Sequence, residues 1–138
     1  MTSKKQVLVR IDSRQDGHNL IQRVSGELFF KGRQIYLRYR EPSLEMGNTL
    51  TTVKIGGQEI KLIRHGDIRS EQTFIHGGKR NGYYETQHGM LSLETQTRWI
   101  RQNLSAGLGS LEWEYDLHVM EEHAGTYTLK LVIQEDKG

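Results

Sequence analysis

Arg64 occupies a position in the amino-acid sequence where a hydrophobic residue is expected. In the stretch IKLIRHGDI, an extended chain places Arg64 on the same side as Ile60 and Leu62, so the arginine continues a hydrophobic row. A guanidinium cannot be neutralised, so on an inward-facing row it must be paired or stay hydrated. Glu41 has the same status, because it ends the inward row that includes Tyr39.

Two rival interpretations of Arg64 follow. In the first, Arg64 forms an ion pair with Glu41 near a barrel mouth, or extends into solvent at a strand end. In the second, Arg64 belongs to a polar cluster in an apolar pocket and binds the carboxylate or phosphate of an amphipathic ligand. An internal pair with Glu41 would compete with such a ligand, and either Tyr83 or Tyr84 can be the inward tyrosine. The expected ligand-binding residues are Arg64, Glu41, Tyr39, Tyr84, Thr86, Thr95 and Thr97, with Leu62, Leu93, Trp113 and Leu129 as apolar contacts.

Signals for catalysis or metal binding are weaker. The chain has no Cys, and its six His include no His-x-His pair and no HExxH motif; His118 and His123 form at most a weak metal site across a turn. No serine lies in a nucleophile elbow, and the stretch GGKRNG joins two strands instead of opening a helix, so it lacks the amides of a phosphate loop. We therefore expect no cofactor, no metal and no catalytic residue. An enzyme stays open as a third hypothesis, the least favoured one, and would require a group with a perturbed pKa in the lumen.

Alternation of apolar and polar residues runs along nearly the whole chain and predicts about ten strands. LEWEYDLHV is the clearest strand, with Trp113 and Tyr115 inward. The alternation breaks at Trp99 and Ile100, because two consecutive residues both require burial. This break predicts a bulge, a sheet corner or a short helical turn. Turns are expected at Lys31-Gly32, Gly56-Gly57, Asn81-Gly82 and Ala124-Gly125.

Successive hairpins with one apolar face must bury that face on a second sheet or curl it shut. The chain of 138 residues fits one domain, 1–138, and its strands follow one another through short turns. We therefore expect an all-β fold, a single antiparallel up-and-down β-barrel of about eight to ten strands, in preference to a sandwich.

A series of motifs carries a family resemblance along almost the whole chain. In order they are YRE, TTVKI, LIRHG, QTFIHG, YETQHGMLSLETQT and YDLHV, between residues 39 and 119. Together they resemble the YwiB-like family of small uncharacterised bacterial proteins. The resemblance implies a calycin-like barrel, akin to lipocalins and fatty-acid-binding proteins. It supplies no active site, because the family's biochemical role is unassigned.

Composition limits the partners. Nineteen Lys and Arg against 17 Asp and Glu give a net charge of +2, which attracts neither nucleic acid nor an anionic membrane. A basic outer stripe, which could meet an RNA backbone, is more simply a solvated strand face, so we expect no nucleic-acid partner. It consists of Gln34, Tyr36, Arg38 and Arg40. The start MTSKKQVLVRIDSRQ is neither a signal peptide nor a membrane span, and with no Cys we expect a cytoplasmic protein.

Two hypotheses of function follow. The first is a barrel that binds a small anionic amphipathic molecule in its lumen, with Arg64 as the charge anchor. The alternative is a non-catalytic interaction module, in one form a homodimer, that works through an outer face or an open edge strand and has an interior filled by its own side chains. Cavity volume distinguishes them, because a ligand binder needs several hundred Å³ of lumen.

Overall fold

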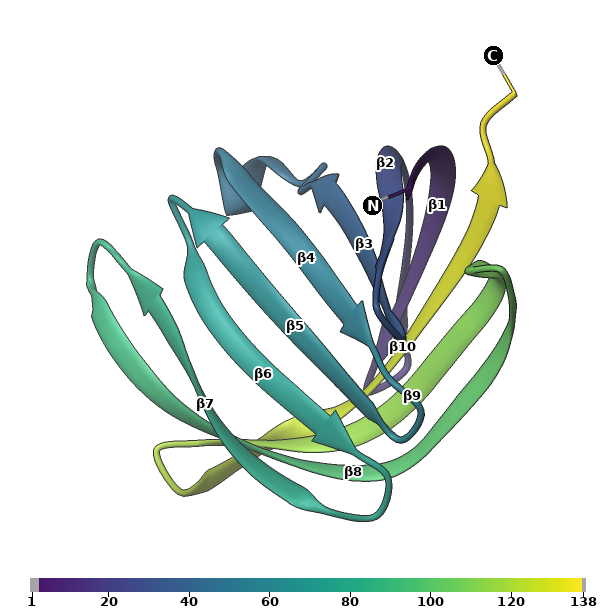
Figure 1. Cartoon of the computed structure of the whole chain (residues 1–138). Coiled ribbons are helices and arrows are strands. Elements are labelled where there is room, and N and C mark those ends of the chain that lie inside the picture. The colour runs from purple at the N-terminus through teal and green to yellow at the C-terminus, as the bar shows by residue number, and fades with distance from the viewer. Residues whose placement is uncertain (1–2, 138) are drawn as a thin grey trace.

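Ten antiparallel strands close into one barrel in the computed structural model, which describes residues 3–137 (Figure 1). Each strand pairs with its neighbours in sequence, and β1 pairs with β10 to close the sheet. The expected all-β, up-and-down barrel is thereby confirmed. The strands are β1 (Ser3–Gln15), β2 (His18–Lys31), β3 (Gln34–Arg40), β4 (Thr49–Ile55), β5 (Glu59–Gly66), β6 (Arg69–Ile75), β7 (Lys79–Thr86), β8 (Gly89–Ser105), β9 (Leu108–Val119) and β10 (Glu122–Glu135).

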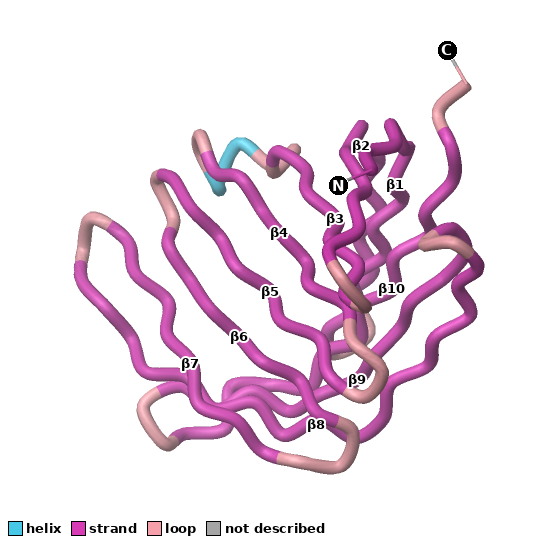
Figure 2. The backbone as a smooth tube through the Cα atoms, viewed as in Figure 1, coloured by secondary structure: helices cyan, strands magenta, loops and turns pink. Residues whose placement is uncertain are grey.

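Helical structure in the described part of the chain is a single 3-10 turn, η1 (Leu44–Met46), between β3 and β4 (Figure 2). No helix there is long and apolar enough to cross a membrane.

Alternation along the strands produces the core, because every second side chain points into the barrel. Trp113 and Phe74 are fully buried and their rings lie 5.4 Å apart. Buried polar residues share the inner face, on β4, β6 and β8. The interior is therefore partly a packed apolar core and partly a polar lining. The apolar core includes Val7, Val9, Leu28, Leu37, Val53, Ile55, Ile60, Leu111, Leu131 and Ile133, and the polar lining consists of Thr49, Thr51, Ser70, Gln72, Thr95 and Thr97.

The break in alternation near Trp99 is a β-bulge. The register between β8 and β9 shifts between Thr97 and Trp99, so Ile100 pairs with inward Trp113. The extra residue in β8 thus returns Ile100 to the inward-facing row after the bulge.

Two expected turns are misplaced. The turn expected in the glycine-rich loop 77–82 falls at residues 76–78, and the Asn81-Gly82 pair of this loop lies inside β7. Gly82 is needed there because a Cβ on it would lie 2.1 Å from the Glu71 carbonyl oxygen of β6. Glycine marks a close approach of two strands at this point.

Ala124-Gly125 is likewise not a turn, because it lies in β10, at a register shift between His123 and Gly125. The β9–β10 turn is at Met120 and Glu121, whose φ angles are 52° and 73°. A left-handed turn made of two non-glycine residues gives no turn signal in the sequence.

Pairing is incomplete at two places in the wall. β6 and β7 pair through three residue pairs, and the Thr95 hydroxyl of β8 donates to the Thr73 carbonyl of β6 at 2.7 Å. β2 pairs with β3 only over residues 26–31, so among the described residues its first eight, 18–25, pair with β1 alone. The second gap leaves a strand edge uncovered.

Candidate functional site

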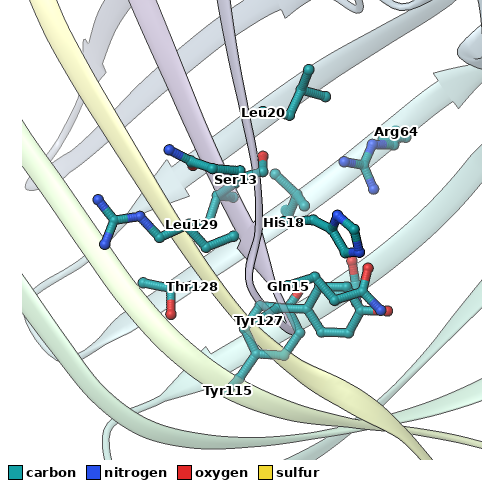
Figure 3. Close-up of a pocket in the computed structure, with 13 residues that line it drawn as sticks. Ser13, Gln15, His18, Leu20, Arg64, Tyr115, Tyr127, Thr128 and Leu129 are labelled. Atoms are coloured by element: carbon teal, nitrogen blue, oxygen red, sulfur yellow. The ribbon is translucent and has the colours of Figure 1, made fainter.

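A cavity of about 360 Å³ lies between the β1–β2 hairpin and the inner faces of β5, β6, β9 and β10 (Figure 3). Its lining combines aromatic, aliphatic and hydrogen-bonding side chains, with the Arg64 guanidinium pointing into it. The lining residues are Ser13, Arg14, Gln15, His18, Asn19, Leu20, Leu62, Arg64, Gln72, Tyr115, Tyr127, Thr128 and Leu129.

Arg64 is placed by the alternation of β5 and pairs with Ser70 on one side and Thr51 on the other. Its Nε atom lies 3.5 Å from Oε2 of Glu41, and the two side chains are 19% and 8% exposed. The ion-pair interpretation therefore has geometric support. The Arg64 guanidinium donates no hydrogen bond within the described part of the chain, while the Thr51 hydroxyl donates to Oε2 of Glu41. The terminal nitrogens of Arg64 thus keep their donor capacity.

Two buried tyrosines report the electrostatic field of Arg64. Burial raises the pKa of Tyr115 to about 12, and the positive charge of Arg64 opposes this rise. Burial and then the charge of Glu41 raise the pKa of Tyr39 well above its usual range, again opposed by Arg64. The charge of Arg64 therefore acts both on Tyr115, which lines the cavity, and on Tyr39, which does not.

Aromatic rings form one side of the cavity. Tyr115 and Tyr127 stack with centroids 5.5 Å apart, and Tyr115 also contacts the buried Phe74 at 4.6 Å. Contacts on both sides hold Tyr115 between the packed core and the cavity. This surface is suited to the carbon skeleton of a ligand.

Buried polar atoms without a partner lie on the same inner face. Within residues 3–137, the Ser70 hydroxyl and the Thr97 hydroxyl are buried and have no hydrogen-bond partner. Nε of Arg64 makes no hydrogen bond either, but Glu41 is its ion-pair partner. Ser70 pairs with Arg64, and Thr97 pairs with Tyr115, so both hydroxyls lie beside residues that line the cavity. Such groups are costly to bury unless water or a ligand satisfies them.

The residues expected to bind ligand are only partly brought together. Tyr84 is the inward tyrosine, because it pairs with Ser70, and its hydroxyl lies 4.0 Å from Sδ of Met46. Thr86 accepts a hydrogen bond from the His88 amide at the β7–β8 turn. Among the seven expected residues, Arg64 lines the cavity, and Glu41 reaches it only as the partner of Arg64; Tyr39, Tyr84, Thr86, Thr95 and Thr97 do not line it.

The apolar contacts divide in the same way. Leu62 and Leu129 line the cavity, whereas Leu93 and Trp113 do not. Sequence reasoning missed Gln72, although a buried glutamine on an inward row gives the same signal as Arg64. It also missed Tyr127, Gln15 and His18, because alternation identifies a face of a strand but not the height of a residue inside the barrel.

Other candidates from the sequence form no second site. His118 and His123 pair across β9 and β10 with ring centroids 5.3 Å apart, and Nε2 of His123 lies 3.5 Å from Oδ1 of Asp116. No group of three His, Cys, Asp or Glu within the described part of the chain can hold a metal ion.

The basic outer stripe packs on Phe29 of the neighbouring strand β2. Tyr36 stacks on Phe29 at 5.1 Å, and the Arg38 guanidinium lies 5.0 Å from the centre of the Phe29 ring. These contacts give Tyr36 and Arg38 of the stripe a structural role on the outer face.

Comparisons with known proteins agree with the fold. The chain is 28% identical over 112 residues to the uncharacterized beta-barrel protein YwiB of Bacillus subtilis (strain 168), covering 81% of this chain and 78% of that protein. The crystal structure of the ywiB protein from Bacillus subtilis matches with a TM-score of 0.75 at 20% identity, covering 99% of this chain and 94% of that one. Residues 6–131 match the model of a domain of unknown function, DUF1934. This β-barrel chain therefore belongs to the DUF1934 family.

Proposed function

We propose that the barrel binds a small anionic amphipathic molecule in its lumen, with Arg64 as the charge anchor. The observation that carries the proposal is the cavity of about 360 Å³ into which Arg64 projects opposite stacked tyrosines. This volume lies in the range of small-molecule sites, roughly 300–1,000 Å³. A filled interior would have favoured the interaction module instead.

The chemistry of the lining supports an anionic head and an apolar tail. The Nη atoms of Arg64 can donate two parallel hydrogen bonds to a carboxylate or phosphate. Gln72, which is 6% exposed, can supply a further polar contact, while Leu62, Leu129 and Tyr127 offer an apolar surface. These groups match a ligand with one charged end.

Glu41 tunes this site and does not exclude the ligand. Its carboxylate approaches Arg64 at Nε, the edge of the guanidinium nearest the main chain, and it also accepts the Thr51 hydrogen bond. A ligand anion that binds the Nη atoms shares the arginine with Glu41. Binding is therefore weaker than with an unpaired arginine, because two negative charges share one cation.

Native mass spectrometry of the freshly purified protein, compared with its denatured mass, tests for a retained ligand. In parallel, the fluorescence of the anionic amphipath 8-anilinonaphthalene-1-sulfonate is titrated against the wild type, Arg64→Met and the matched control Arg33→Met. Arg33 lies in the β2–β3 turn and is exposed, so its loss removes the same charge away from the cavity.

We expect binding of the probe to weaken about tenfold or more in Arg64→Met and to stay unchanged in Arg33→Met. Any mass adduct of the wild type should be absent from Arg64→Met. Equal affinity of the wild type and Arg64→Met for the probe, with both proteins folded by circular dichroism, would refute the anchor role.

A further inference from the structure

The edge of β2 at residues 18–25 has no strand neighbour on the side away from β1 within residues 3–137. Elsewhere in this wall β2 is covered by β3, from Gly26 to Lys31. An exposed edge presents unpaired N–H and C=O groups and is a template for another strand.

The hairpin turn determines which backbone groups face outward. Asp16 and Gly17 have φ angles of 47° and 85°, the pattern of a two-residue type I′ turn, so Gln15 and His18 form its hydrogen-bonded closing pair. Hydrogen-bonded and non-bonded pairs alternate along an antiparallel ladder. The N–H and C=O groups of Asn19, Ile21 and Arg23 are therefore turned away from β1.

Two large apolar side chains are exposed on this edge. Leu20 is 56% exposed and Ile21 is 47% exposed, on opposite faces of the strand. Arg23 is the one formally charged group of residues 18–25 if His18 is neutral. The edge thus lacks the multiple charges that usually block strand addition.

The edge is complementary to a second copy of itself. When two β2 edges pair antiparallel about a two-fold axis at Leu20, Leu20 lies opposite its own copy and Ile21 lies opposite Asn19. The two Ile21 side chains become diagonal neighbours, within reach of each other. Arg23 falls opposite Gly17, six residues or roughly 20 Å from the other Arg23. Both exposed apolar residues find a partner in this register, and no like charges oppose each other.

The second copy also reaches the cavity. Leu20 lines the cavity from the edge strand. In the proposed register, Leu20 of the second copy would lie beside it on the same inner face. Pairing in this register extends the sheet past the uncovered gap between β2 and β3 next to the cavity.

We propose that this chain forms a two-fold dimer by antiparallel pairing of the β2 edges, centred on Leu20. The proposal does not depend on the nature of the luminal ligand. Its occupant is a second copy, and a different extended peptide on this edge would be a contrary result.

Size-exclusion chromatography with light scattering tests the dimer over a wide range of protein concentrations. The wild type should give twice the 16.0 kDa chain mass. Ile21→Pro removes an N–H that faces the free side and leaves the β1 ladder intact, so the dimer Kd should rise about 100-fold or more. Leu44→Lys, at a 97% exposed leucine in η1, is the matched surface control and should remain dimeric.

The two-fold register is tested by opposite charges at one position. Leu20→Asp and Leu20→Lys should each be monomeric, because each places like charges opposite each other, and a mixture of the two should form a heterodimer. Circular dichroism verifies that each variant is folded. A monomeric wild type, a dimeric folded Ile21→Pro, or no heterodimer from the mixture would each overturn the proposal.

Discussion

Glu41 and Arg64 face each other across the inner wall of the barrel, with Oε2 of Glu41 3.5 Å from Nε of Arg64. The carboxylate is the more buried member, and its second contact is the Thr51 hydroxyl. The pair places a negative charge beside the anchor of the proposed ligand site. Removal of the negative charge of Glu41 should therefore lower the stability of the fold and raise the affinity for an anionic ligand.

Glu41→Gln keeps an acceptor for Thr51 but removes the negative charge. We expect the free energy of unfolding to fall by about 1 kcal/mol, because Arg64 loses its counter-charge while retaining some solvent. The affinity for 8-anilinonaphthalene-1-sulfonate should rise about tenfold, because the competing anion is gone. Urea unfolding and fluorescence titration measure the two effects; an unchanged probe affinity would contradict competition by Glu41.

Arg64→Met leaves the Glu41 carboxylate buried without its cation. Unfolding free energy should fall by about 2–3 kcal/mol, less than for a pair fully removed from water. The double variant Arg64→Met/Glu41→Gln should be about 1–2 kcal/mol more stable than the sum of the single changes predicts. Strict additivity in this double-mutant cycle would show that the two groups do not interact.

Alkaline pH should weaken the fold through its buried tyrosines. Burial raises the pKa of Tyr115 to about 12 from an ordinary value of 10.0, so the unfolded chain ionises first. The contribution of neutral Tyr115 to stability is therefore complete below pH 10 and is lost as pH rises toward 12. Stability measured across this window should fall less steeply in Tyr115→Phe, and ultraviolet titration should show a late-ionising tyrosine that the variant lacks.

Asp116 on the outer face should make the stability of the fold depend on pH in the acid range. The Thr126 hydroxyl donates to Oδ1 of Asp116 at 2.6 Å and, with Arg98 and His123, holds the pKa of Asp116 below its usual value. The ionised Asp116 therefore stabilises the fold at pH values above its pKa in the unfolded chain. This stabilisation is lost as pH falls through the pKa of Asp116 in the folded protein. In Thr126→Val the Asp116 pKa should rise, as carbon-detected NMR titration can show. No rise would mean that the hydroxyl contributes nothing.

Gly82→Ala should be severely destabilising. A Cβ at residue 82 would lie 2.1 Å from the Glu71 carbonyl oxygen, so β6 and β7 would have to separate. A loss of about 3 kcal/mol is expected from this overpacking. Gly57→Ala is the control, because a Cβ there meets nothing within 4 Å, and its thermal unfolding should match that of the wild type.

The sequence was sufficient for the barrel because alternation directly specifies which side chains are buried. It was also sufficient to bring Arg64 toward Glu41, since both continue inward rows. It misplaced turns where glycine served another purpose, as at Gly82, and where the turn used Met120 and Glu121 in left-handed conformations.

The composition of the cavity was harder to predict. Arg64 and Tyr127 lie on strands that are far apart in the sheet order, and only the curvature and stagger of the barrel bring them to one cavity. The alternation of apolar and polar residues along a strand does not predict how far neighbouring strands are staggered. Tyr39 and Thr95 thus point inward as predicted, yet neither borders the space available to a ligand.

Closure of the barrel joins the two ends of the sequence, since Val7 of β1 pairs with Glu135 of β10. Neighbouring hairpins can form from local contacts, but this last ladder links segments more than a hundred residues apart and is costly in chain entropy. During synthesis the sheet has an open side until β10 has left the ribosome. The slow step of folding should accordingly be the docking of the first strand against the last.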